Sequence, residues 1–335
     1  MREVDVLIAG AGPAGTTCAS VLRRQGVPCL LVDPAEFPRE KLCGGGLTPR
    51  AWQLVDEVFP GLAYDYIPVR QMRLLMDGEF RGSYTLDPEI RVVQRKSFDN
   101  ALLGEYLKEG GELLRDRVME IREPGGGVIE VTMRSGETVR CRTLVGADGA
   151  DSRVRRYLSP GSRADTLILE QYTPRSGSDE ITIELSPKYR QGYFYVFPNP
   201  ACDVVGYAER HVTREKFEAL LRAHGVERTR IRGAFITTAR RYPRHDHILL
   251  VGDAGGWCDN LSYEGIYFAL ATGRNAAQAI LSGRPFSETN REVAVRRRHW
   301  VFATFLLYNR LGLAVVKRIS RDRQATERIL NHHLQ

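Results

Sequence analysis

A glycine motif near the N-terminus limits the folds open to this chain more than any other part of its sequence. Gly10, Gly12 and Gly15 form a G-x-G-x-x-G run between a short apolar segment at 4–9 and a predicted helix at 16–25. The first glycine permits a tight turn, the second lets the backbone approach a pyrophosphate, and the third lets helix pack on strand. The helix N-terminus supplies N–H donors and a positive dipole end to the phosphates. The motif therefore predicts a dinucleotide-binding unit around Gly10–Gly15, Ala14 included, and fits NAD as well as FAD.

A second predicted strand, at residues 28–33, ends in Asp33, which lies 18 residues after Gly15. A carboxylate at this strand end can accept hydrogen bonds from both hydroxyls of a ribose. Strand, helix and second strand together predict a βαβ unit with the short loops that such units use. A lone glycine-rich turn does not explain this combination.

Further along the chain the hydrophobic pattern changes to alternation. Residues 71–94 and 165–210 contain short alternating runs, which predict antiparallel strands. Turns are expected at Asp77-Gly78 and at Asp87-Pro88. A short buried strand at 248–251 and a helix at 264–281 then return to the nucleotide-binding pattern.

The predicted fold class is therefore α/β, with a Rossmann-like, three-layer dinucleotide-binding domain and an inserted antiparallel β-sheet substrate domain. The expected divisions are a discontinuous nucleotide-binding domain at 1–70, 95–160 and 245–287, a substrate domain at 71–94 and 161–244, and a helical C-terminal segment at 288–335.

Composition excludes several classes of function. The 335 residues are 43% hydrophobic, which is ordinary for a globular protein. The net charge is +7, but no nucleic-acid-binding motif accompanies the arginines, so we expect no nucleic-acid partner. The six cysteines include no C-x-x-C pair, which argues against zinc and against a disulfide framework. Nothing at the N-terminus resembles a signal peptide, and a cytoplasmic location is expected.

Two later segments indicate FAD by resemblance. Residues 146–155, GADGADSRVR, resemble the G-A-D-G-x-x-S-x-V-R element of FAD-dependent hydroxylases and reductases. Residues 250–256, LVGDAGG, resemble the second FAD fingerprint, whose aspartate binds the ribityl chain. The resemblance implies FAD as the cofactor, with Asp148 and Asp253 beside it.

The same resemblance assigns further contacts to the cofactor. Arg95, in QRKSFDNALL, matches an arginine that precedes a helix and touches the cofactor, and Val118 occupies the strand position whose backbone meets the adenine. Gly265 and Ile266 begin a predicted helix whose N-terminal amides face the flavin pyrimidine. A helix N-terminus there would stabilise the negative charge that develops on reduced flavin.

The loop at 41–47, KLCGGGL, resembles the K-x-C-G-G-G-L loop of the geranylgeranyl reductase family. Glycines such as Gly44 and Gly46 would let the backbone lie against the flavin ring. The resemblance leaves Cys43 as a proton donor, a gate or a flavin-facing thiol, and the plain alternative is a small residue in a tight loop.

A second signature of that family lies at 193–208. The run YFYVFP, followed after seven residues by GYA, resembles Y-x-W-x-F-P-x(7 or 8)-G-x-G, with Tyr195 in place of tryptophan and Ala208 in place of the last glycine. Tyr193, Tyr195 and Phe197 share one face of the strand. They either floor an apolar pocket over the flavin or pack into a core, and the resemblance favours the pocket.

Another departure lies in the segment that precedes the helix at 264–281. Family members usually have proline where this chain has Asn260 and glycine where it has Tyr263. The resemblance places these residues beside the flavin ring, so the two exchanges are expected to retune the substrate or the electron donor.

The resulting hypothesis is an FAD-dependent oxidoreductase that reduces C=C bonds of a prenyl or other apolar substrate, with Cys43, Tyr193, Tyr195 and Phe197 as catalytic residues. The chain shows no second glycine fingerprint for a separate NAD(P)H-binding domain. The reductant is therefore expected to be transiently bound NAD(P)H or a small electron carrier. The alternatives are an FAD-dependent monooxygenase of an aromatic or polyketide-like substrate and a non-catalytic flavin- or lipid-binding protein.

The C-terminal segment contains an apolar stretch at 300–316 with basic residues on both sides. Asn309 and Arg310 interrupt it, and its length is marginal for a bilayer. We expect a helix that packs on the FAD-binding domain. The alternative is an interfacial helix that makes peripheral contact with anionic lipid.

Overall fold

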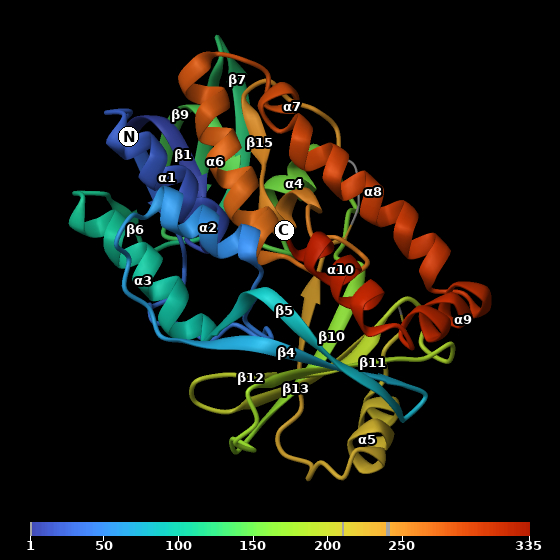
Figure 1. Cartoon of the computed structure of the whole chain (residues 1–335). Coiled ribbons are helices and arrows are strands. Elements are labelled where there is room, and N and C mark those ends of the chain that lie inside the picture. The colour runs from blue at the N-terminus through green and yellow to red at the C-terminus, as the bar shows by residue number, and fades with distance from the viewer. Residues whose placement is uncertain (1, 210, 239–241) are drawn as a thin grey trace.

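The computed structural model describes residues 2–209, 211–238 and 242–335, which form two β-sheets and a helical C-terminal segment (Figure 1). In these ranges the first sheet has seven strands in the order β6-β2-β1-β9-β8-β7, with β15 also paired to β9. Its strands are β1 (Arg2–Ala9), β2 (Cys29–Val32), β6 (Leu113–Leu114), β7 (Val118–Gly125), β8 (Val128–Met133), β9 (Thr138–Gly146) and β15 (Ile248–Leu250).

The centre of this sheet is parallel and buried on both faces. β1 pairs in parallel with β2 and with β9. Val6 and Ile8 point into a core shared with the helices, whereas Leu7 and Ala9 point into a second core with β7 and β8. The continuous apolar run at the end of β1 therefore follows from burial between two layers.

The helices that cover one face are α1 (Pro13–Arg24), α3 (Arg95–Lys108) and α6 (Ile266–Ser282), with α2 (Pro49–Val58) packed on α6 (Figure 1). Gly10 has φ +109°, and a side chain there would collide with the carbonyl of Ala147. A side chain on Gly273 of α6 would likewise overlap the backbone of Ala14. Close backbone approach at these glycines brings β1, β9, α1 and α6 to one point.

The second sheet has eight described strands in the order β14-β10-β13-β12-β11-β4-β5-β3. They are β3 (Gly46–Leu47), β4 (Tyr66–Met76), β5 (Glu79–Val93), β10 (Thr166–Thr173), β11 (Glu180–Leu185), β12 (Tyr193–Pro198), β13 (Asp203–Glu209) and β14 (Arg232–Ile236). The pairs are antiparallel except β11–β4, which is parallel. Helix α5 (Arg214–Ala223) covers its outer face, where Phe217 and Leu221 are buried. The predicted α/β fold with an antiparallel sheet and a helical C-terminus is confirmed.

One predicted turn is wrong. Asp77-Gly78 does connect β4 to β5, but Asp87-Pro88 lies inside β5. The pairing of β4 with β5 shifts register between Val69 and Gln71, opposite this dipeptide. Proline lacks the N–H that a ladder needs, and the irregular pairing at this point removes that requirement.

The C-terminal segment consists of α7 (Phe286–Thr289), α8 (Arg291–Leu307), α9 (Arg310–Ile319) and α10 (Arg323–Leu334), and it runs from the first sheet to the second (Figure 1). The side chains of 300–303 and 305–307 lie outside what the structure describes. Within the described ranges, every helix is too short or too polar to cross a membrane.

Specific hydrogen bonds attach this segment to β5. Tyr84 Oη donates to the carbonyl of Ser320 at 2.7 Å, and the N–H of Thr85 donates to Glu327 Oε1 at 2.8 Å. Asn331 accepts from the N–H of Asp87 at 3.1 Å. Because Tyr84 and Ser320 are both buried, these bonds hold the C-terminal helices in one position against the sheet.

Tyr84→Phe should lower the free energy of unfolding by about 1 kcal/mol, because it leaves the buried Ser320 carbonyl without its donor. Denaturant unfolding measures the change. The control is Tyr66→Phe at a ring that is 39% exposed, which should change stability little. Equal stabilities of the two variants would show that the Tyr84 bond does not anchor the segment.

Candidate active site

A cavity of about 1160 Å³ lies between the two sheets and extends from the glycine turn to the C-terminal helices. This volume exceeds the range usual for small ligands, so the cavity has room for a long cofactor together with a substrate. Every site residue predicted from the sequence lines it, apart from Gly15. Gly15 instead packs against the carbonyl of Gly10.

The glycine turn forms one end of the cavity. Gly12 lies beside Arg39, whose Nη2 would be 3.4 Å from a Cβ added at Gly12. Asp33 accepts hydrogen bonds from the N–H groups of Ala11 and Ala35, each at 2.8 Å. Each carboxylate oxygen of Asp33 keeps acceptor capacity for a ribose hydroxyl.

Two arginines share one carboxylate near this end of the cavity. Arg95 donates from Nε and Nη2 to the two oxygens of Asp99, both at 2.8 Å, and Arg39 approaches Asp99 at 3.2 Å. One carboxylate therefore serves two guanidinium groups, and Arg39, which lies beside the glycine turn, keeps further N–H donors for an anion. Sequence reasoning missed Arg39, although a basic residue just after the second strand was a usable signal.

Asp148 and Asp253 stand at the ends of neighbouring strands. Asp148 Oδ2 accepts from the N–H of Arg153 at 2.7 Å, whereas its Oδ1 is buried without a hydrogen-bond partner among the described residues. Burial raises the pKa of Asp148. Burial also raises the pKa of Asp253, against the opposing effect of Lys41 and Arg95.

A buried guanidinium joins these two strand ends. Arg155 of α4 (Arg153–Leu158) is fully buried and donates to the carbonyls of Asp253 at 3.1 Å and Ala254 at 3.3 Å, and also to the carbonyl of Ala150. It thus ties the 146–155 element to the short helix η1 (Gly252–Gly255).

The N-terminus of α6 opens onto the cavity. Gly265 is its N-cap, and an added Cβ would lie 3.8 Å from both Asp253 Oδ1 and Cys258 Sγ. The preceding residue, Glu264, is buried and accepts from Nε of Arg50 at 3.0 Å. Arg50 also donates to the carbonyl of His333 at 2.9 Å, which connects α10 to this helix start. Val118, at the beginning of β7, lines the cavity on the glycine-turn side.

These features fit an FAD molecule. The glycine turn at Gly12, the positive charge of Arg39 beside it and the carboxylate of Asp33 suit its pyrophosphate and ribose. Asp148, whose Oδ1 has no hydrogen-bond partner among the described residues, and the helix start at Gly265 line the same cavity.

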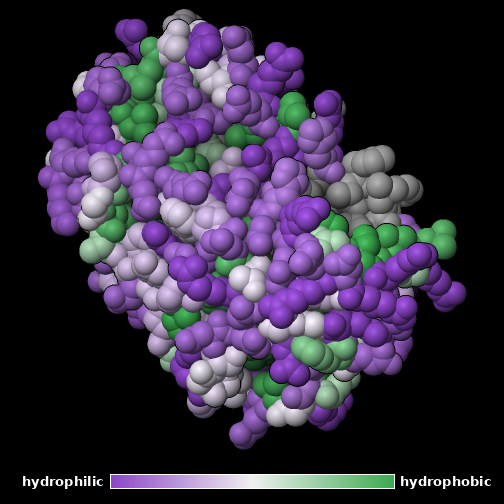
Figure 2. Space-filling view, in the orientation of Figure 1, coloured by the Kyte–Doolittle hydropathy of each residue, from purple (hydrophilic) through white to green (hydrophobic). Residues whose placement is uncertain are grey.

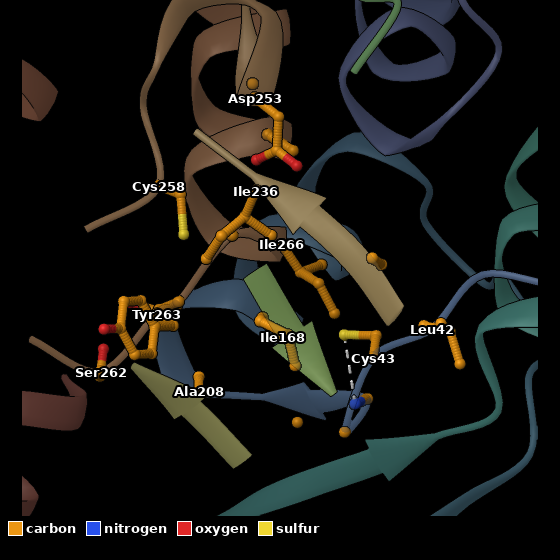
Figure 3. Close-up of a pocket in the computed structure, with 18 of the residues that line it drawn as sticks. Leu42, Cys43, Ile168, Ala208, Ile236, Asp253, Cys258, Ser262, Tyr263 and Ile266 are labelled. Carbon is orange, nitrogen blue, oxygen red and sulfur yellow. Dashed lines mark hydrogen bonds between the residues drawn. The ribbon is translucent and has the colours of Figure 1, made fainter. Parts of the chain in front are cut away.

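The cysteine loop closes over the aromatic strand. The N–H of Gly45 donates to Cys43 Sγ at 3.4 Å, and the sulfur points into the cavity towards Ile168 and Ile266 (Figure 3). Side chains added at Gly44 and Gly46 would lie 3.1 and 2.8 Å from the Phe197 ring. The glycines therefore let the loop lie directly against Phe197.

The three aromatic residues of β12 form a connected row. The ring centroids of Tyr193 and Tyr195 are 5.7 Å apart, and those of Tyr195 and Phe197 are 5.5 Å apart. Tyr193 and Tyr195 are 9% and 5% exposed, and both line the cavity. The row is thus packed like a core and also forms a cavity wall.

Tyr263 occupies a position where the resembling family has glycine, and its φ is +54°. This left-handed conformation is unfavourable for a bulky residue. The Tyr263 ring stacks on Tyr193 at 5.7 Å with an interplanar angle of 26°, and its hydroxyl donates to the carbonyl of Gln191. These contacts hold an aromatic side chain in the cavity beside Ser262 (Figure 3).

Sequence reasoning also missed Glu170, which is 1% exposed and lies in the cavity wall on β10. Tyr195 Oη donates to Glu170 Oε1 at 2.5 Å. Burial raises the pKa of Glu170 to about 7, although the Tyr195 hydrogen bond and the charges of Lys41 and Arg95 oppose this effect.

Comparison with known proteins identifies the cofactor class. The family model described as FAD binding domain matches residues 3–169, and the cavity built by those residues fits FAD. The chain is an FAD-dependent oxidoreductase. The predicted FAD and the predicted kinship with geranylgeranyl reductases are confirmed.

Two relatives of this flavoenzyme carry reductase names. A menaquinone reductase of Mycolicibacterium smegmatis is 29% identical over 84% of this chain and 77% of its own length. A chloroplastic geranylgeranyl diphosphate reductase of Oryza sativa subsp. japonica is 27% identical over 84% of this chain and 67% of its own length.

Solved structures share the fold of the flavoenzyme. A geranylgeranyl bacteriochlorophyll reductase-like protein of Thermoplasma acidophilum superposes with a TM-score of 0.80 and 21% identity, over 96% of this chain and 92% of its own. A probable FAD-dependent monooxygenase of Pseudomonas aeruginosa gives a TM-score of 0.73 and 18% identity, over 98% of this chain and 100% of its own. These two structures show the fold that the chain shares with them.

Arg39→Gln should weaken FAD binding about tenfold, because it removes a charged donor beside Gly12. Reconstitution of the apoprotein, followed by flavin fluorescence, measures the affinity. The control is Arg115→Gln, at a side chain that is 58% exposed and pairs with Glu36. An Arg39 variant with the affinity of the control would remove Arg39 from the phosphate site.

Proposed function

We propose that this flavoenzyme reduces carbon–carbon double bonds of a prenyl chain or of another apolar substrate. The apolar half of the cavity, beyond Cys43 and Tyr195, supports this proposal most directly. Its walls come from the second sheet and from α9 and α10. They comprise Met72, Leu74, Ile90, Ile168, Ile181, Ile183, Leu185, Leu313, Val316, Ile319, Ile329, Leu330 and Leu334.

Such a surface favours a long hydrocarbon over a small polar molecule. Burial of apolar area stabilises a bound hydrocarbon by about 25 cal/mol per Å². Few polar groups in this half of the cavity could pair with a charged substrate. The reductase names of the relatives, geranylgeranyl diphosphate reductase and menaquinone reductase, support the same substrate class.

Reduced FAD, when bound at this site, supplies a hydride to one carbon of the double bond. The protein has to hold the alkene, exclude water and deliver a proton to the other carbon. We assign the holding role to Tyr193, Tyr195 and Phe197, whose ring faces also stabilise positive charge that develops when protonation leads. Cys43 points into the same space and is our candidate for the group nearest the reacting carbon.

The reductant is proposed to be NAD(P)H, bound transiently, or a small electron carrier. A monooxygenase of an aromatic or polyketide-like substrate is the second candidate, because a probable monooxygenase shares the fold. Coupled oxygen uptake and NAD(P)H consumption on addition of such a substrate would identify it.

Anaerobic mixing of the reduced holoenzyme with a geranylgeranyl lipid tests the proposed function. We expect reoxidation of the flavin and a mass gain of two hydrogens for each reduced bond, measured by absorbance and by mass spectrometry. A saturated phytanyl lipid is the control, because it has no double bond to reduce. Neither reoxidation nor a mass gain with prenyl lipids and prenyl quinones would contradict the proposal.

We further propose peripheral contact of α9 with an anionic membrane. One side of α9 lines the cavity through Leu313 and Val316, whereas Leu311 and Val315 are 81% and 54% exposed. Exposed basic residues, Arg318 and Arg321, follow on the same segment. Figure 2 shows hydrophobic surface at this end of the molecule. A helix with both faces apolar and basic flanks suits the surface of a bilayer and would let a lipid chain reach the cavity.

Leu311→Asp combined with Val315→Asp should reduce co-sedimentation with vesicles that contain anionic lipid, and added salt should weaken binding of the unmodified protein. The control is Phe80→Asp, which changes an equally exposed apolar residue (55%) at the β4–β5 turn. Vesicle binding that responds equally to both changes, or no binding at all, would argue against contact through α9.

A further inference from the structure

The tyrosine that replaces the signature tryptophan has a polar partner. Three strands lie side by side in the order β10-β13-β12, and their register places Glu170 and Tyr195 on either side of Gly206. A side chain at Gly206 would overlap the Tyr195 ring. The missing side chain thus gives the Tyr195 ring room to lie across β13, so that its hydroxyl reaches Glu170 on the far strand.

Glu170 is unusual among the carboxyl groups of this sheet. Its Oε1 accepts the Tyr195 hydrogen bond at 2.5 Å, whereas its Oε2 is buried without a hydrogen bond of good geometry in the described part of the chain, and the backbone of Cys43 is the next donor to this carboxyl. Glu184, a second buried carboxylate, accepts from the N–H of Gly78 at 2.9 Å and pairs with His224. Glu184 does not line the cavity, whereas Glu170 does. A buried, half-satisfied carboxyl in a cavity wall costs stability, and a function explains its presence.

We propose that Glu170 is the proton donor for the reduction, held in position by Tyr195. The inference rests on the proposed function. The π bond of the alkene opens, one carbon takes the Glu170 proton, and the other takes a hydride from the reduced cofactor. Two C–H bonds form, the two electrons come from reduced FAD, and the Glu170 carboxylate regains its proton from solvent. NAD(P)H or the electron carrier then restores the reduced cofactor.

The surroundings of Glu170 suit a group that changes protonation near neutral pH. Burial raises its pKa to about 7, close to the value at which a general acid works best in neutral solution. The titratable and charged groups around it come from several elements. They are Lys41 and Cys43 after β2, Arg95 of α3, Tyr172 of β10, Tyr195 of β12, Cys202 after β12 and, at the paired position of β14, Arg232.

The pH dependence follows from these contacts. An acid donates only while protonated, so the rate of reduction should fall as the pH rises through about 7. The hydrogen bond from Tyr195 lowers the pKa of Glu170. Removing that hydroxyl should therefore raise the pKa and move the fall in rate to higher pH.

The experiment compares Glu170→Gln, Tyr195→Phe and Cys43→Ser holoenzymes, with Glu184→Gln as the matched buried control. Glu170→Gln should slow reduction of a geranylgeranyl lipid about 100-fold or more and abolish the pH dependence near 7. FAD affinity and reduction of the bound flavin by dithionite should not change. Tyr195→Phe should shift the pH dependence upwards, and Cys43→Ser and Glu184→Gln should keep it in place.

Infrared difference spectroscopy gives a readout that needs no substrate. The carbonyl band of a protonated carboxyl should titrate near pH 7 in the unmodified holoenzyme, disappear in Glu170→Gln and titrate at higher pH in Tyr195→Phe. Loss of the pH dependence in Cys43→Ser, or a Glu170→Gln enzyme with an unchanged rate, would overturn the inference. Failure of the unmodified enzyme to reduce any prenyl substrate would instead remove the proposed function on which it rests.

Discussion

The site depends on one buried guanidinium. Arg155 joins the end of β9 to the short helix after β15, through the carbonyls of Ala150, Asp253 and Ala254. Asp148 and Asp253 project from the segments that it joins. A buried charge without partners is costly, whereas one with several carbonyl acceptors fixes the backbone that supplies them. The cofactor groups therefore keep their spacing although they come from segments about a hundred residues apart.

The two sheets contribute chemically different parts of the cavity lining. The parallel sheet contributes glycines, strand-end carboxylates and a helix start, which suit a charged dinucleotide. The second sheet contributes the aromatic row of β12 and most of the apolar wall. The C-terminal helices complete that wall, and the contacts of Arg50 with Glu264 and with the carbonyl of His333 connect them to the start of α6. An enzyme that brings an apolar chain to a flavin needs both chemical environments in one cavity.

Short sequence motifs predicted those parts of the site that are formed by a few consecutive residues. The turn at Gly10, the strand end at Asp33 and the helix start at Gly265 each follow from a few consecutive residues. Glu170 could not be found in this way, because its role arises from the register of distant strands. Arg155 ends the GADGADSRVR element, but its acceptors at Asp253 and Ala254 come from a segment about a hundred residues away. A charged residue in the apolar run TLILEQY was the available signal for Glu170. The turn predicted at Asp87-Pro88 was wrong for a similar reason. Only the pairing of β5 with β4 shows why proline is tolerated inside that strand.

We propose that the reacting double bond lies between the flavin and the aromatic row. A crystal structure of the FAD-bound enzyme with a geranylgeranyl lipid tests it most directly. We expect a double bond beside Cys43 and Tyr195, close to the Glu170 carboxyl, and a chain that continues along Leu313 and Val316. A lipid bound outside this cavity, or one whose double bonds all lie away from Tyr195, would contradict it.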